Sequence, residues 1–222
     1  MLFGFDTNIL ILRIPAILLA FTIHEFFHGY VAFCLGDNTA KWQGRLTLNP
    51  IKHLDPLGAI MLLLGGFGWA KAVPVNPYNL RHPKRDMALI ALAGPVSNFV
   101  LAFFALFIFM FLAAVGWLGA STVSMYFVLF FFQLFVVNMG LGLFNLIPMP
   151  PLDGSKILAA FLPHHLYWSY TNFRYGFPIL ILLVMGPQFG INTGINLILG
   201  VPMDAFFRGY SFVIERFLGL FF

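Results

Sequence analysis

The sequence predicts an all-α polytopic membrane protein with about 4–6 transmembrane helices and a small β-hairpin or re-entrant element on the cytoplasmic side. Hydrophobic residues make up 60% of the 222 residues and charged residues only 9%, whereas soluble domains carry roughly 25% charged residues. Apolar runs long enough to cross a bilayer recur along the chain. Most of the basic residues gather in one segment that lies between two such runs.

The first predicted span covers residues 14–35 and would be about 33 Å long, enough to cross the hydrocarbon core. This run continues past residue 30 without a small-residue cleavage site, so we expect no cleavable signal peptide. The single cysteine, Cys34, excludes an internal disulfide and a zinc site built from several thiolates.

The segment after this span, residues 37–86, carries a strong excess of positive charge. Three acids stand against seven of the twelve basic residues of the chain, namely Lys41, Arg45, Lys52, Lys71, Arg81, Lys84 and Arg85. The positive-inside rule therefore predicts that the segment is cytoplasmic. A basic strip could also bind nucleic acid, but the flanking spans favour topology, and we expect no nucleic-acid partner.

Three stretches of this segment carry local structural signals. "GRLTLNP" (44–50) alternates like a strand, and "KAVPVNP" (71–77) is held extended by its prolines. These are the candidate strands, and an edge strand could pair with the backbone of an unwound substrate helix. "GAIMLLLGGFGWA" (58–70) is apolar but too short and glycine-rich to span, which predicts a re-entrant or interfacial element.

The second half of the chain is predicted to be helical. Spans are expected over residues 87–118 and 123–147, with a short helix over 154–162. A fourth span is expected near residues 175–185, where it is cut by Gly186 and Pro187. The tail, 195–222, is broken at Pro202, and the sequence leaves open whether it spans the bilayer or lies at its interface.

Three ionisable residues, His24, Glu25 and His28, lie inside the first span in "HEFFH". Such residues cost roughly 2.5–3.5 kcal/mol each in hydrocarbon even on the lenient insertion scale, so they mark functional sites. The i,i+4 spacing puts both imidazoles on one helix face, where they can hold one zinc ion. Glu25 lies beside that position and can serve as the catalytic base. The alternative is a buried cluster of polar side chains that hydrogen-bonds neighbouring helices.

A hydrolytic zinc site usually has three protein ligands and an open fourth position. Asp153 in "PPLDG" follows an apolar span, and the charge distribution and the order of the spans place it at the same membrane depth as His28. It is therefore the best candidate for the third ligand. An N-cap of the short helix that follows is an equally weighted role for Asp153. The other candidates are His53, His82, His164 and His165.

Together with "FNLIPMPPLDG" (144–154), "HEFFH" resembles the site-2 protease family of intramembrane zinc metalloproteases. "GDNTAKWQGRLTLNPIKHLDPLG" (36–58), "GWAKAVPVNP" (68–77) and "KRDMALIALAGPVSN" (84–98) resemble its compact bacterial branch, which has no PDZ or CBS domain. The resemblance implies one membrane-embedded protease domain over 1–222, with a core at about 8–162 and C-terminal helices at about 173–222.

The same resemblance implies that His24, His28 and Asp153 bind one Zn²⁺, that Glu25 is the catalytic base, and that Asn145 helps to hold the substrate backbone. The expected substrate is a membrane protein with a transmembrane helix, cleaved in or near that helix by regulated intramembrane proteolysis. We expect the enzyme in the bacterial inner membrane, with its active site toward the cytoplasm. The rival interpretation is a metal transporter or metal-sensing protein that uses the same site.

Two further residues are candidates for substrate contacts. Asn98 follows Gly94 and Pro95 in the second span, where an interhelical hydrogen bond is the competing role. His53 in "NPIKHLDP" could contact substrate or support a metal ligand, and a purely structural role competes there too.

Overall fold

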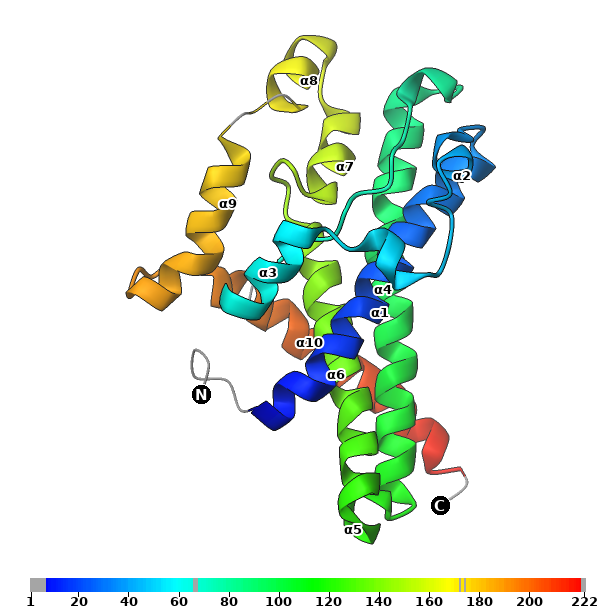
Figure 1. Cartoon of the computed structure of the whole chain (residues 1–222), viewed down its shortest axis with the longest axis vertical. Coiled ribbons are helices and arrows are strands. Elements are labelled where there is room, and N and C mark those ends of the chain that lie inside the picture. Colours follow the sequence, from blue (N-terminus) through cyan, green and yellow to red (C-terminus); the bar gives the residue numbers. More distant parts are fainter. Residues whose placement is uncertain (1–6, 66–67, 172, 174, 221–222) are drawn as a thin grey trace.

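The computed structural model describes residues 7–65, 68–171, 173 and 175–220, and these residues form a helical bundle (Figure 1). Within them, four helices are long and apolar enough to cross a membrane: α1 (Thr7–Cys34), α4 (Pro83–Ala114), α6 (Thr122–Asn145) and α10 (Ile195–Leu218). The three spans predicted before residue 150 are therefore confirmed as helices. The tail is one helix that continues through Pro202.

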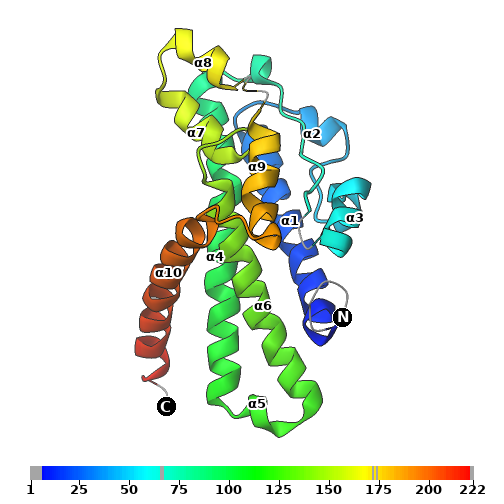
Figure 2. The same ribbon diagram turned by 90° about the vertical axis from the view of Figure 1, so that its left-hand side faces the viewer.

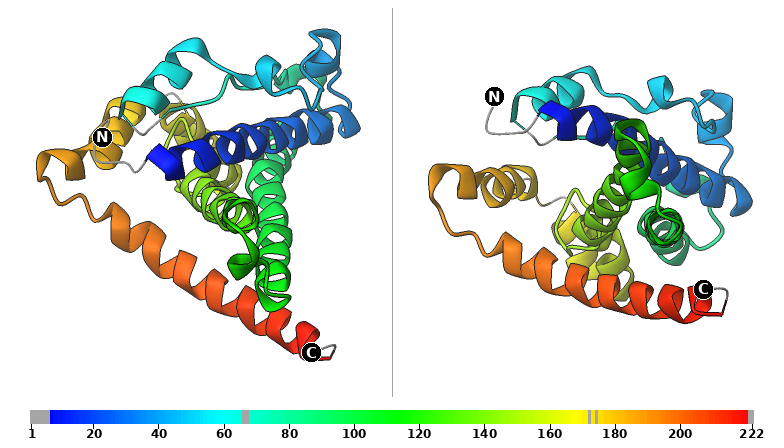
Figure 3. Two further views of the ribbon diagram at one scale, coloured as in Figure 1. Left: turned by 60° about the horizontal axis from the view of Figure 1, so that its bottom comes forward. Right: turned by 90° about the horizontal axis from the view of Figure 1, so that it is seen from below.

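Small residues let the spans approach one another closely. Ala16 and Ala20 on α1 and Ala102 on α4 are each 0% exposed, as expected where helices pack in lipid by close backbone approach. Seen along the bundle, α4 and α6 lie between α1 and α10 (Figure 3). In this arrangement α4 contacts both α1 and α6, and α1 also contacts α6.

Helices α4 and α6 run antiparallel and are joined at one end by the short helix α5 (Trp117–Ala120) (Figure 2). Helix α6 begins with a capping box, in which the Ser121 side chain accepts from the Ser124 N–H and the Ser124 hydroxyl accepts from the Ser121 N–H. The cap satisfies backbone groups that a helix end otherwise leaves unpaired.

Short elements cover the rest of the bundle. They are α2 (Thr39–Trp42), η1 (Pro50–His53), α3 (Pro56–Gly65), η2 (Pro77–Asn79), α7 (Asp153–Phe161) and α8 (His164–Thr171). Helices α2, α7 and α8 lie at the end opposite α5, and α3 lies about halfway along the bundle (Figure 1). The predicted short helix after the third span is confirmed as α7. The apolar stretch 58–70 contains most of α3, while residues 66–67 lie outside the described part of the chain.

The predicted β-hairpin is wrong. Residues 44–48 form a turn and a bend, Pro50 begins η1, and residues 71–76 have no regular secondary structure. The described residues contain no sheet, and their only strand-like pairing is an isolated antiparallel bridge between Leu54 and Ala70.

The two segments form no strand ladder because side chains hydrogen-bond to backbone carbonyls that strand pairing would otherwise use. The Arg45 guanidinium donates to the Lys71 carbonyl at 2.6 Å, and Nε2 of His53 donates to the Thr47 carbonyl at 2.8 Å. Pro74 has no N–H to offer a neighbouring strand. The alternation of apolar and polar side chains therefore predicted a strand wrongly, because here side chains, and not a neighbouring strand, make the hydrogen bonds to the backbone.

The C-terminal helices are less closely packed. The span predicted near residues 175–185 is wrong, because helix α9 (Gly176–Met185) has 10 residues, about 15 Å, which is too short to cross the bilayer. It is followed by η3 (Gly186–Phe189). Helix α10 diverges from the bundle toward its start (Figure 3). It contacts α4 through the Tyr210 hydroxyl, which donates to the Phe99 carbonyl at 3.2 Å, and through the stacked rings of Phe206 and Phe99.

Candidate metal centre

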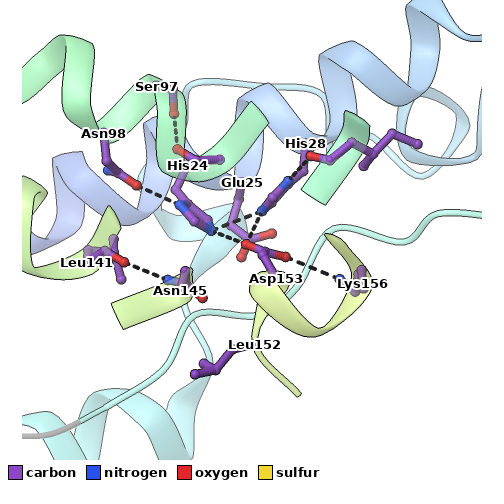
Figure 4. A network of polar contacts seen from close by, with 12 residues as sticks. His24, Glu25, His28, Ser97, Asn98, Leu141, Asn145, Leu152, Asp153 and Lys156 are labelled. Carbon is purple, nitrogen blue, oxygen red and sulfur yellow. Dashed lines mark hydrogen bonds and ion pairs between the residues drawn. The ribbon is translucent and has the colours of Figure 1, made fainter. Parts of the chain in front are cut away.

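Three potential metal ligands from two distant parts of the chain meet inside the bundle (Figure 4). His24 and His28 lie one turn apart on α1, and Asp153 is the first residue of α7. The two histidine Nε2 atoms are 3.0 Å apart, and Oδ2 of Asp153 lies 3.1 Å from Nε2 of His24 and 3.0 Å from that of His28. All three side chains are buried.

This triangle has the dimensions of a zinc site. Four ligands at about 2.0–2.2 Å in a tetrahedron lie about 3.3–3.6 Å from one another, slightly more than the separations of 3.0–3.1 Å observed here. Two imidazoles and one carboxylate are a donor set that zinc accepts, and three protein ligands leave the fourth position open. Among the described residues, no other group of three or more such side chains is arranged to hold a metal.

Gly94 on α4 makes room for the two imidazoles. A Cβ at this position would lie 2.5 Å from Nε2 of His28 and 2.6 Å from Cε1 of His24, closer than real Cβ contacts allow. Any side chain at residue 94 would therefore push the histidines away from Asp153. The sequence analysis missed this role, although a glycine before Pro95 inside a span was a visible signal.

Hydrogen bonds on the far side of each ring orient the imidazoles. Nδ1 of His28 lies 2.7 Å from the Ile90 carbonyl, which can only accept, so this nitrogen carries the proton. Nδ1 of His24 lies 2.6 Å from Oδ1 of Asn98. With both protons on Nδ1, the two Nε2 lone pairs face Asp153 and can bind a metal.

Asp153 does not serve as the cap of α7. The N-cap residue is Leu152, whose carbonyl accepts from the Ser155 hydroxyl, and the Asp153 carboxylate instead points at the histidines (Figure 4). The carboxylate lies where both histidine Nε2 atoms converge, and an ionised carboxylate is the form that binds metals.

Gly154 explains why α7 begins at this place. A Cβ there would lie 2.2 Å from the Leu146 carbonyl, so only glycine lets the start of α7 rest against the end of α6. This contact fixes Asp153 relative to the spans.

Glu25 lies next to His24 and is also buried. Its Oε2 accepts a hydrogen bond from the Val73 N–H at 2.8 Å. The other carboxylate oxygen makes no hydrogen bond to the described residues. One oxygen is therefore anchored by the extended segment 71–76, and the second remains available beside the three potential ligands.

The other predicted site residues lie at different distances from this centre. Asn145 is half-buried near Asp153, and its side chain donates to the Leu141 carbonyl at 3.0 Å (Figure 4). Asn98 is 0% exposed and stands behind His24, on the side away from the open position. His53 is buried outside the group of ligands, where it bonds the 44–50 segment.

Among the histidines whose side chains the structure describes, no other one weighed as a third ligand joins the cluster. His82 is exposed at the start of α4, and His165 is exposed on α8. His164 is the first residue of α8, and its side chain lies outside the described part of the structure. The metal group of the described residues is thus built from His24, His28 and Asp153.

Comparisons with known proteins agree with this centre. The chain is 44% identical over 172 residues to the "Putative zinc metalloprotease YwhC" of Bacillus subtilis, covering 77% of this chain and 78% of that protein. It is 31% identical over 187 residues to the "Putative zinc metalloprotease Rip2" of Mycolicibacterium smegmatis, covering 81% and 69%. No solved structure matches the chain. The model of peptidase family M50 matches residues 13–185, and the chain therefore belongs to this family of site-2-protease-like zinc metallopeptidases.

Proposed function

We propose that this zinc metallopeptidase is an intramembrane endopeptidase that cuts other membrane proteins in or near their transmembrane segments, in regulated intramembrane proteolysis. The observation that carries the proposal is the meeting of His24, His28 and Asp153 inside the membrane-spanning bundle, with Glu25 beside them. A metal transporter using the same site is disfavoured by the peptidase family of the chain.

In this proposal His24, His28 and Asp153 hold zinc. Zinc, when bound, lowers the pKa of water to about 7 and polarises the scissile carbonyl. Glu25 takes the proton from the attacking water on its free oxygen and later delivers it to the leaving amine. Its second oxygen stays on the Val73 N–H, which holds the carboxylate in place during both transfers.

A transmembrane helix hides its peptide bonds in its own hydrogen bonds, so a substrate must unwind before cleavage and needs new backbone partners. The extended segment 71–76 offers them. The N–H groups of Ala72 and Val75 and the carbonyl of Val73 make no hydrogen bond within the described part of the chain. We propose that an unwound substrate pairs with this segment in extended form, while Asn145 contacts its backbone near Asp153.

The basic segment 37–86 supports a cytoplasmic orientation of the centre in a bacterial inner membrane. Helix α2 of that segment lies at the same end of the bundle as α7 (Figure 1). We propose one protease domain over 1–222, in which the core at about 8–162 carries the chemistry and the C-terminal helices pack beside it.

To test the proposal, the wild-type protein and Glu25→Gln are each co-expressed with a panel of single-span membrane proteins, and cleavage of these proteins is compared. This substitution removes the base but leaves all three proposed ligands. Cleavage should fall about 10²–10⁴-fold while the zinc content of the purified protein is unchanged. Cleavage at the wild-type rate by Glu25→Gln would refute the proposal.

A further inference from the structure

A chain of buried hydrogen bonds joins α6 to the imidazole of His24. Nδ1 of His24 lies 2.6 Å from Oδ1 of Asn98, and Nδ2 of Asn98 lies 2.8 Å from Oδ1 of Asn138. Nδ2 of Asn138 in turn lies 2.8 Å from the carbonyl of Leu134. Asn98 and Asn138 are both 0% exposed. Three spans, α1, α4 and α6, are therefore linked through amide groups that have no contact with solvent.

The direction of every bond in this chain is set at its α6 end. The Leu134 carbonyl can only accept, so the amide nitrogen of Asn138 must face it and the amide oxygen must face Asn98. Asn98 then turns its nitrogen toward this oxygen and toward the Ala20 carbonyl at 3.2 Å. Its own oxygen is left facing His24. His24 must donate from Nδ1, and its Nε2 lone pair is free for a metal.

We propose that Asn138 is a positioning residue that fixes the tautomer of His24 through Asn98 and thereby raises the affinity of the centre for zinc. This inference rests on the proposed role of His24 as a zinc ligand. Asn138 touches neither the ligands nor the open position, and its nearest polar partner toward the centre is the Asn98 amide.

Without the oxygen of Asn138, the orientation of Asn98 is poorly defined. Only the Ala20 carbonyl, at 3.2 Å, would still favour the present orientation. The reversed amide would donate to Nδ1 of His24 and move the ring proton to Nε2, which then cannot bind a metal. Partners behind metal-bound histidines typically contribute 10–100-fold to metal affinity. Because Asn138 acts through one intermediate, Asn138→Leu should lower zinc affinity roughly tenfold.

A double-substitution cycle separates this role from a packing role. In Asn98→Asp, an ionised carboxylate has only acceptor oxygens, so His24 must donate from Nδ1 whatever stands at residue 138. Adding Asn138→Leu to Asn98→Asp should therefore cost no further zinc affinity. If Asn138→Leu acted by loosening the packing between α4 and α6, it would instead weaken zinc binding both in the wild type and in Asn98→Asp.

The measurement is the zinc affinity of the purified proteins, obtained by competition with a chelator. Thr22→Val is the matched control, because Thr22 is a buried polar residue of α1 whose hydroxyl bonds only the Leu18 carbonyl, and it should bind zinc like the wild type. His24→Ala should lose zinc, and full zinc occupancy there would overturn the proposed site itself. If His24→Ala loses zinc while Asn138→Leu binds with wild-type affinity, or loses equally in both backgrounds, the role of Asn138 is overturned and the site stands.

Discussion

The Glu25 carboxylate accepts a hydrogen bond at 2.8 Å from the backbone N–H of Val73, 48 residues along the chain. This bond connects the middle of a membrane span to an extended segment outside the helices. Both partners are buried. Hydrogen bonds to charged groups contribute roughly 1.5–3 kcal/mol, enough to hold one carboxylate orientation. The same segment would then orient the base and receive the substrate.

Replacing Val73 by proline removes that N–H and should lower kcat roughly 10–100-fold, because a misplaced catalytic group loses the geometry on which its rate depends. Zinc content should not change, since no proposed ligand contacts Val73. Val73→Ala is the matched control, because it removes side-chain packing but keeps the N–H. Steady-state cleavage of a model transmembrane substrate gives the answer. Equal activity of Val73→Pro and Val73→Ala would show that the bond does not orient Glu25.

Gly94→Ala should abolish most zinc binding. The new Cβ would occupy space 2.5 Å from Nε2 of His28, so at least one imidazole must leave the centre. Gly140→Ala is a matched control in a neighbouring span, because a Cβ there would meet only Cε of Met203 at 3.7 Å. Metal analysis of both proteins in one detergent tests the expectation. Normal zinc content in Gly94→Ala would mean that the histidines do not need this space.

The two histidines of the centre that lie on the same helix could be predicted from the sequence. His24 and His28 fall on one face because of the helical period, and the cost of ionisable groups in lipid makes such a pair informative. Span counting gave only the depth of Asp153 and left the helix N-cap role equally weighted, and the resemblance to the site-2 protease family favoured the ligand role. Gly94 and Asn138 were missed because their roles depend on how α4 and α6 are rotated against α1, and periodicity within one helix does not specify that rotation.

In the fold, too, features set by local sequence were predictable, whereas features that depend on contacts between distant residues were not. The early spans were predictable from length and apolar composition. The hairpin was not, because Arg45 and His53 satisfy backbone carbonyls that strand pairing would otherwise use. The tail was left open because Pro202 suggested a break, yet α10 continues through it.

Asp37, just after α1, should stabilise the protein more at neutral than at acidic pH. Burial by itself would raise its pKa, but hydrogen bonds from Thr39, Asn79 and the Asn76 N–H lower it below the ordinary value. A lowered folded-state pKa gives stability that is present above the unfolded value of about 3.9 and is lost as pH falls through the folded value. Asp37→Asn should therefore have a lower Tm than the wild type at pH 7, with a smaller difference below about pH 4.

Thermal unfolding in detergent across this pH range measures the effect. Asp204→Asn, an exposed position on α10, removes the same charge and should leave Tm nearly unchanged. A gap between the wild type and Asp37→Asn that stays constant down to pH 3 would contradict the assigned pKa shift.

Asp153→Asn should lose zinc and activity together while the protein stays folded. The amide keeps the size of the side chain but offers a much weaker ligand than the carboxylate that now faces both histidines at 3.0–3.1 Å. Its matched control is Ser155→Ala, two residues along α7, which removes a buried hydroxyl bonded to the Leu152 carbonyl without touching the centre. If Asp153 merely supported the start of α7, the two variants would lose similar thermal stability and both would keep zinc. As a ligand, Asp153→Asn alone should show reduced metal content at a Tm close to that of the zinc-free wild type.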